Sequence, residues 1–233
     1  MEKTQTKPRI RIGRTETDVI NEMDFSHQRK TLTAVYPFYR PENSKTLQNL
    51  IRKKGHVEPT SSQVTSFVHE YFNSDEPQAT AVKWIMNYGS FRGFTGILYL
   101  PQEKIAHFID YPKFDKESVV DRDNLLERLD ESYAQVPFEH FKREHVNWRD
   151  VAEHPYFVAF AGGKEGAKKL AELASKHSMQ KASCWIPDIS NLKEPIARVA
   201  ALSSSLDGKW LCVISSNSGD YEGNYAFGVL KTK

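Results

Sequence analysis

The chain has 233 residues, a formal net charge of +2 at pH 7, and 39% hydrophobic and 27% charged residues. This composition excludes a disordered chain, and its 13 Phe, 10 Tyr and 4 Trp can fill a sizeable core. The small net charge argues against a protein that tracks phosphates, and no apolar run is long enough to cross a bilayer.

The two cysteines, Cys184 and Cys212, each lie in an apolar setting, which favours free buried thiols over a disulfide scaffold. Met1 is followed by charged and polar residues, without the apolar region of a secretory signal. We therefore expect a soluble, globular, cytoplasmic protein with no membrane partner.

The first elements differ in how clearly the sequence defines them. Charge alternates with isoleucine over residues 9–14, which is typical of a short edge strand, whereas residues 24–36 have only weak helical spacing and stay ambiguous. Asn43 or Ser44 can cap a helix that has an apolar stripe and stops at Gly55.

Two further helices are expected before residue 90. Thr60 and Gln63 have the spacing of a capping box, and an apolar face follows them. A third helix can start at Pro77 and stop at Gly89, although its apolar residues would also suit a buried strand.

A hairpin follows, with strands expected at 94–100 and 105–109. Three helices and a hairpin in this order match a winged helix, which offers a DNA-binding alternative. Its contact residues would be Gln78, Thr80 and Lys83 on the third helix, with Arg92 and Lys104 on the wing. Lys83 is the only cationic residue between Glu76 and Gly89, which argues against this alternative.

The second half alternates more often between helix and strand. Asp121 can cap a helix, and residues 136–154 have no single period, so we expect a loop with a short helix there. Asp207 and Gly208 are the strongest hairpin signal in the chain. Strands are expected at 184–186, 197–202, 209–214 and 224–230.

These patterns predict an α+β class, with a helical N-terminal region and a β-hairpin followed by a mixed α/β sheet region. Residues 111–113 look like a connector, so a boundary is expected at residue 112. The predicted division is 1–112 and 113–233, and a single continuous domain is the alternative.

The segment 156–177 carries the main functional hypothesis. Its apolar run predicts a buried strand that feeds an amphipathic helix through Gly162 and Gly163. Free N–H groups at the start of that helix, together with the helix dipole, could bind an anion. The candidate residues for binding an anionic small molecule are Gly162, Gly163, Lys164 and Glu165.

The glycine spacing matches neither a Walker phosphate loop nor a dinucleotide-binding fold, and Glu165 would repel a bound phosphate. The structural alternative is a tight strand-to-helix turn in which Gly166 allows close packing.

Metal and covalent chemistry have weaker support. Three Glu–His dipeptides, at 139–140, 144–145 and 153–154, carry ligand types suited to Zn²⁺, but their spacing matches no compact metal motif. We expect no metal site. No serine lies in a nucleophile elbow, and cysteines within apolar strands are inert.

The leading functional hypothesis is therefore a non-catalytic binding or accessory protein. The first alternative is an enzyme that acts on a phosphorylated small molecule, which Gly162, Gly163 and Lys164 would hold. DNA binding through the N-terminal helices is the second alternative, and no particular cofactor is indicated.

Overall fold

The computed structural model describes residues 10–14, 19–39, 43–141, 145–177, 179, 181–204, 209–216 and 224–230. Within these residues the class is α+β, as the sequence predicts. The helices are α1 (Ser44–Lys53), α2 (Ser61–Phe72), α3 (Ala79–Tyr88), α4 (Arg122–Leu126), α5 (Pro155–Phe160) and α6 (Lys164–Lys176), with 3-10 turns η1 (Leu129–Glu131) and η2 (Phe138–His140).

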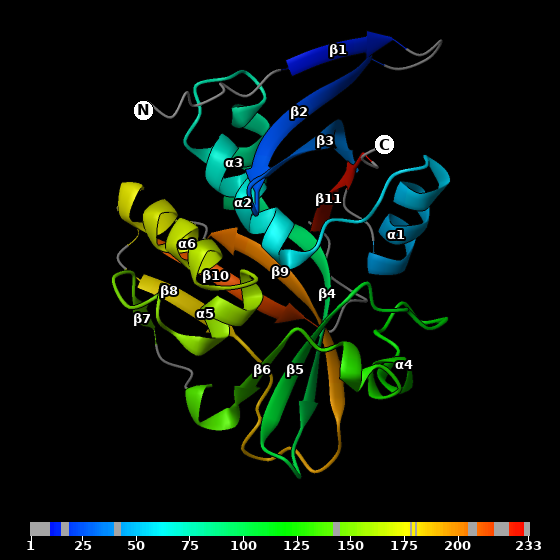
Figure 1. The fold of residues 1–233 in the computed structure, drawn as a ribbon, viewed down its shortest axis with the longest axis vertical. Helices are drawn as coiled ribbons and strands as arrows, with labels where there is room; N and C mark the ends of the chain where they lie inside the picture. Colours follow the sequence, from blue (N-terminus) through cyan, green and yellow to red (C-terminus); the bar gives the residue numbers. More distant parts are fainter. Residues whose placement is uncertain are drawn as a thin grey trace.

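The strands form one 11-stranded mixed sheet. They are β1 (Ile10–Arg14), β2 (Val19–His27), β3 (Lys30–Tyr39), β4 (Ser90–Leu100), β5 (Ile105–Asp110), β6 (Ala134–Pro137), β7 (Val146–Asn147), β8 (Lys181–Trp185), β9 (Ile196–Ser204), β10 (Trp210–Ser216) and β11 (Asn224–Val229). The order is β1-β2-β3-β11-β4-β9-β10-β8-β7, and β5 and β6 branch from β4 (Figure 1).

Strand β4 is the centre of this sheet. Its first residues pair with β11, its later residues pair with β5, and β9 pairs along its other edge. Because β11 lies between β3 and β4, strands from both sides of residue 112 share the sheet. The division into 1–112 and 113–233 stays a prediction.

Helices cover both faces of β4, and every residue of this strand is buried. The main core lies where α2, α3, α5 and α6 pack on one face (Figure 1). On the other face, α4 covers a small cluster that includes Leu98 and Leu125, and α1 covers a second cluster that includes Leu47 and Phe94.

Local signals in the sequence place several helix ends correctly. The side chain of Asn43 accepts a hydrogen bond from the Thr46 N–H at 2.8 Å. Thr60 and Gln63 form the expected capping box at the start of α2. The third helix is confirmed, and it ends at Gly89.

The segment 24–36 is a β-hairpin rather than a helix, so the predicted helical N-terminal region begins only after three strands. Its turn residues, Gln28 and Arg29, have φ of 45° and 64°. Both positive φ values fit a two-residue hairpin turn, for which Asn and Gly are the usual residues. Gln and Arg carry no such signal, and the turn was therefore missed.

The predicted strand before Gly162 is wrong, because residues 155–160 form helix α5. Pro155 occupies the first turn of the helix, where its missing N–H costs no hydrogen bond. Tyr156, Phe157 and Phe160 are all fully buried. When an apolar run is buried on most sides, its periodicity cannot distinguish a strand from a short helix.

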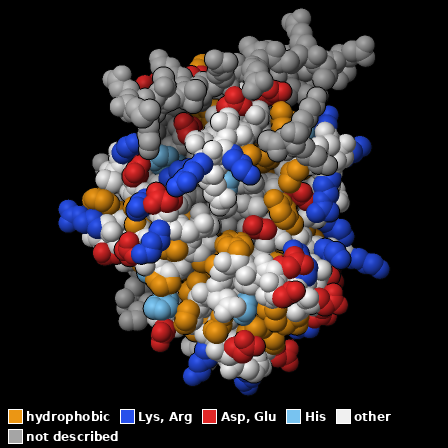
Figure 2. All heavy atoms as spheres, viewed as in Figure 1, with side chains coloured by type: hydrophobic (Ala, Val, Ile, Leu, Met, Phe, Trp, Pro, Cys, Tyr) orange, Lys and Arg blue, Asp and Glu red, His pale blue; other side chains and the backbone are white. Residues whose placement is uncertain are grey.

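The expected hairpin is confirmed as β4 and β5, but it does not support the winged-helix alternative, because β4 is the central strand of the sheet and Arg92 is fully buried. Lys83 donates a hydrogen bond to the Ser74 carbonyl instead of standing free. Figure 2 shows basic, acidic and apolar side chains interspersed over one face of the molecule. Among the described helices, none has the length and apolarity needed to span a membrane.

Candidate functional site

Gly162 and Gly163 form a turn that we call the double-glycine turn. A pocket of about 700 Å³ lies beside it. Its walls come from the β2–β3 turn, the start of α2, the end of β5, strand β6, helix α5 and the start of α6. We call it the turn pocket, and the residues that matter below are Gln28, Ser62, Asp110, Tyr133 and Lys164.

The double-glycine turn joins two helices and is closely packed at Gly162, whereas no atom lies within 4 Å of the Cβ position of Gly163. Gly162 and Gly163 have φ of 72° and 124°, and their N–H groups donate to carbonyl oxygens of α5 at 3.1 and 2.8 Å. A Cβ atom at Gly162 would lie 2.7 Å from the Cβ atom of Ser62. Gly162 is therefore needed both for its backbone conformation and for the close approach of α2.

Three of the four predicted anion-binding residues line the pocket: Gly162, Gly163 and Lys164. Glu165 is not among the lining residues, and its carboxylate binds Lys168 at 2.7 Å. The Lys164 ammonium lies 2.7 Å from the carboxylate of Glu153, which also lines the pocket. The lysine expected to attract an anion is therefore already paired, and the anion site stays a prediction.

The carboxyl of Asp110 is the titratable group that the sequence reasoning missed. Its Oδ1 accepts a hydrogen bond from the Thr95 hydroxyl at 2.5 Å, and Thr95 in turn accepts the Ser61 N–H at 3.0 Å. Burial raises the pKa of Asp110 to about 6, against the opposing effects of the Thr95 hydrogen bond and the Arg128 charge. The one signal in the sequence was a polar residue at the end of an apolar strand.

Two hydroxyl groups hold the C-terminal end of α5 in place. The Tyr133 hydroxyl donates to the Ala159 carbonyl at 3.2 Å, and the Ser61 hydroxyl donates to the Phe160 carbonyl at 2.7 Å. The last carbonyl groups of a helix have no partner within the helix. The Ser61 contact therefore satisfies the Phe160 carbonyl, while Tyr133 adds a second hydrogen bond to the Ala159 carbonyl, which also accepts the Gly162 N–H. Together they fix α5 against α2 and the residue before β6.

The strained β2–β3 turn also contributes to the wall of the turn pocket. Gln28 lines the pocket with a positive φ, and its Nε2 atom lies 3.9 Å from the position that a Cβ atom of Gly162 would take. Non-glycine residues at positive φ cost on the order of 1–3 kcal/mol, and such strain is concentrated at functional sites.

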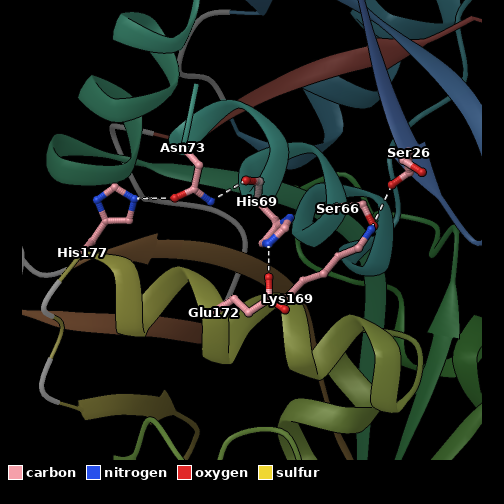
Figure 3. Close-up of polar contacts among 7 residues, drawn as sticks. All are labelled: Ser26, Ser66, His69, Asn73, Lys169, Glu172 and His177. Atoms are coloured by element: carbon pink, nitrogen blue, oxygen red, sulfur yellow. Dashed lines mark hydrogen bonds and ion pairs between the residues drawn. The ribbon is translucent and has the colours of Figure 1, made fainter. Parts of the chain in front are cut away.

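Helix α6 is anchored to α2 and β2 by polar side chains (Figure 3). Lys169 donates to the Ser66 hydroxyl at 3.0 Å and to the Ser26 carbonyl at 2.9 Å. His69 lies 2.9 Å from the Glu172 carboxylate, and burial is the main reason that the pKa of His69 is lowered. The side of the pocket formed by α6 is therefore held in one position.

The Glu–His dipeptides do not come together as a metal site. The Glu139 Oε1 and His140 Nε2 atoms are 3.6 Å apart, and His154 precedes α5. The ring of His145 packs against that of Trp210 at a tilt of 47°, with centroids 4.2 Å apart. Glu144 lies outside the described residues. Within the part of the chain that the structure describes, no three His, Cys, Asp or Glu side chains form a group that could hold a metal ion.

Both cysteines are buried free thiols, as the sequence predicts. Burial raises the pKa of Cys184, with a smaller contribution from Cys212. A thiol of raised pKa is rarely ionised and is a poor nucleophile.

No protein-family model and no curated protein matches this chain. A solved structure described as "Accommodation of massive sequence variation in Nanoarchaeota by the C-type lectin fold" superposes with a TM-score of 0.56 and 13% sequence identity. The match covers 88% of this chain and 99% of that one. At this identity the similarity concerns the fold alone: the chain is similar in architecture to a C-type lectin fold.

Proposed function

We propose that the protein is a non-catalytic binding protein that holds a small, neutral, hydroxyl-rich molecule in the turn pocket. The observation that carries this proposal is the Asp110 carboxyl at a pocket of about 700 Å³. Pockets of this size suit small molecules, and a few well-placed polar groups fix the ligand's orientation. The amide of Gln28 and the hydroxyl of Ser62 are further groups in the lining that can bind hydroxyls.

The charges in the lining favour a neutral ligand over a phosphorylated one. They belong to Asp110, Glu153 and Lys164, and the last two neutralise each other. The carboxylate of Asp110 remains, and it would repel a phosphate while accepting hydrogen bonds from hydroxyl groups. The anionic small molecule proposed from the sequence is thus the second candidate, supported by Gly162, Gly163 and Lys164 in the lining.

The contacts of Asp110 favour binding over catalysis. Thr95 occupies Oδ1, and no described residue gives Oδ2 a hydrogen-bond partner. This oxygen is available to a ligand, whereas an active site needs a second acid, base or nucleophile that converges on the same point. The C-type lectin likeness supports the fold and leaves the ligand to be inferred from the pocket.

The experiment is a thermal-shift screen followed by calorimetry. The compounds are neutral monosaccharides and polyols, their phosphorylated counterparts, and simple amines. We expect a neutral hydroxyl-rich compound to bind and Asp110→Asn to weaken that binding about tenfold or more, because a hydrogen bond to a charged group contributes about 1.5–3 kcal/mol.

Asp130→Asn makes the same chemical change at an exposed carboxylate on η1 and should bind as the wild type does. Binding of phosphorylated compounds alone would favour the anion-site alternative. If no neutral compound binds, or if Asp110→Asn binds as tightly as the wild type, the proposal is wrong.

A further inference from the structure

Among the described residues that line the turn pocket, one is aromatic, namely Tyr133. This residue directly precedes β6, and 41% of it is exposed. Its hydroxyl donates to the Ala159 carbonyl at 3.2 Å, and burial raises the pKa of that hydroxyl. Because the hydroxyl end is buried and bonded, the exposed area lies on the rest of the residue, which includes the carbon atoms of the ring.

Contacts at both ends fix the orientation of the Tyr133 ring. At the backbone end, its N–H donates to the Phe108 carbonyl at 3.1 Å, and at the far end its hydroxyl bonds to Ala159. The ring also packs against that of the fully buried Phe108, with centroids 6.3 Å apart. The core therefore supports the ring as a rigid apolar surface of the pocket, and a surface that is already ordered costs little entropy when a ligand binds.

The carboxyl group of Asp110 lies near this ring. Asp110 ends β5, two residues after Phe108, whose carbonyl accepts the Tyr133 N–H. After burial, the charge of Asp110 is the next cause of the raised pKa of Tyr133. Both side chains line the turn pocket. The pocket therefore combines a hydrogen-bond acceptor with an aromatic ring.

These two groups match the two kinds of surface on a cyclic sugar. A pyranose carries its hydroxyl groups around the edge of the ring, whereas C–H groups gather on a face, which is apolar. The negative face of an aromatic ring attracts such polarised C–H groups. An acyclic polyol has no fixed apolar face, and it loses more conformational entropy when it is ordered.

We propose that Tyr133 makes the turn pocket selective for cyclic sugars: its ring stacks on the C–H face of a pyranose, while Asp110 accepts a hydrogen bond from one of the hydroxyls. This inference rests on the proposed function and adds the class of ligand and the residue that selects it. Stacking removes apolar area of both rings from water, and the carboxyl fixes the sugar's orientation in the pocket.

The test is calorimetry with the methyl pyranosides of glucose and galactose, whose rings cannot open, and with glucitol and galactitol, the corresponding acyclic polyols. We expect the wild type to bind a pyranoside more tightly than its polyol. In Tyr133→Leu, which is apolar but has no aromatic face, the ratio of the two Kd values should fall about three- to tenfold.

Two further variants separate stacking from other effects of the substitution. Tyr133→Phe keeps the ring and loses only the hydroxyl bond to Ala159, so it should keep the wild-type ratio of Kd values. Tyr88→Leu makes the same change as Tyr133→Leu at an exposed ring on α3, outside the pocket lining, and should also keep that ratio.

Proton NMR of the bound pyranoside provides a readout that does not depend on the stability of any variant. Protons above an aromatic face shift upfield, so C–H protons on one face of the sugar should do so in the wild type and in Tyr133→Phe.

The absence of this shift in the wild type, equal Kd values for pyranosides and polyols, or an unchanged ratio in Tyr133→Leu would overturn the selection by Tyr133. In each of these cases, binding that is weakened in Asp110→Asn would leave the proposed function standing. If no neutral compound binds, both the proposed function and this inference are wrong.

Discussion

Asp110 and Arg92 are buried ionisable side chains, and burying such groups costs stability. Asp110 lies on β5 and Arg92 on the central strand β4. Burial favours the neutral form of each side chain, so it raises the pKa of Asp110 and lowers that of Arg92. Among the described residues, Asp110 keeps a hydroxyl partner from Thr95, whereas Arg92 has one hydroxyl partner, Ser216, and two nitrogens without a hydrogen bond. Buried ionisable groups with shifted pKa values are concentrated at functional sites, and Asp110 is the one of the two that lines a pocket.

The pH dependence of stability tests the assignment of Asp110. The pKa of Asp110 is about 6 in the folded protein against the ordinary aspartate value of 3.8, so between these values the native state binds more protons than the unfolded state. The free energy of unfolding therefore falls as pH rises through this window, and the cost is complete above pH 6. We expect Asp110→Asn to be more stable than the wild type at pH 7, by on the order of 2 kcal/mol.

Urea unfolding at pH 4 and pH 7 measures this effect as the difference between the variant and the wild type, which cancels the contributions of the histidines. The gain in free energy of unfolding that Asp110→Asn shows at pH 7 should be much smaller at pH 4. An equal difference at both pH values would show that Asp110 titrates normally.

At the scale of elements, the connection between α5 and α6 depends on close backbone contact. A Cβ atom at Gly166 would lie 2.0 Å from the Ala161 carbonyl oxygen, so the two helices could not keep their present approach. This agrees with the sequence interpretation that Gly166 allows close packing. The same constraint fixes the position of the double-glycine turn and thus one side of the turn pocket.

Gly166→Ala is therefore expected to reverse the usual effect of this substitution. In an exposed helix Gly→Ala stabilises by about 1 kcal/mol, but here the clash should destabilise by about 1–3 kcal/mol. Chemical denaturation measures the change. Gly163→Ala is the matched control, because no atom lies within 4 Å of its Cβ position and only its φ of 124° opposes the substitution. A stabilised Gly166→Ala variant would contradict the packing argument.

For the whole molecule, β11 joins the two halves of the chain. Phe227 of β11 is fully buried. The centroid of its ring lies 6.0, 4.4 and 6.3 Å from the ring centroids of Phe25, Phe67 and Phe91. These three partners come from β2, α2 and β4. Because one C-terminal ring packs against three N-terminal elements, we expect the two halves to unfold together.

Phe227→Ala should lower the free energy of unfolding by about 3–5 kcal/mol while keeping a single transition. Tyr88→Ala, which truncates a ring that is 63% exposed, should cost less than 1 kcal/mol. Far-UV circular dichroism and tryptophan fluorescence should report the same midpoint for each protein. Two separate midpoints would instead support a division of the chain near residue 112.

Much of the secondary structure could be predicted because its causes are local. The caps at Asn43 and Thr60 and the strands on either side of Asp207 and Gly208 depend on residues a few positions apart. The turn residues 207 and 208 themselves lie outside the described residues. At Gln28 and Arg29 in the β2–β3 turn the local signal was weak, and β3 pairs both with the neighbouring β2 and with the distant β11.

The sequence by itself determined the α+β class, most of the helices and strands, and the position of the double-glycine turn, since hydrophobic period, caps and glycines act within one element. Only the tertiary structure decided that residues 155–160 are helical, that Arg92 is buried, and that Asp110 lies at the turn pocket. The physical reason is that burial, and the pKa shifts that follow from it, depend on neighbours that can lie more than a hundred residues away in the sequence, as Ser216 does from Arg92, and no local pattern specifies them.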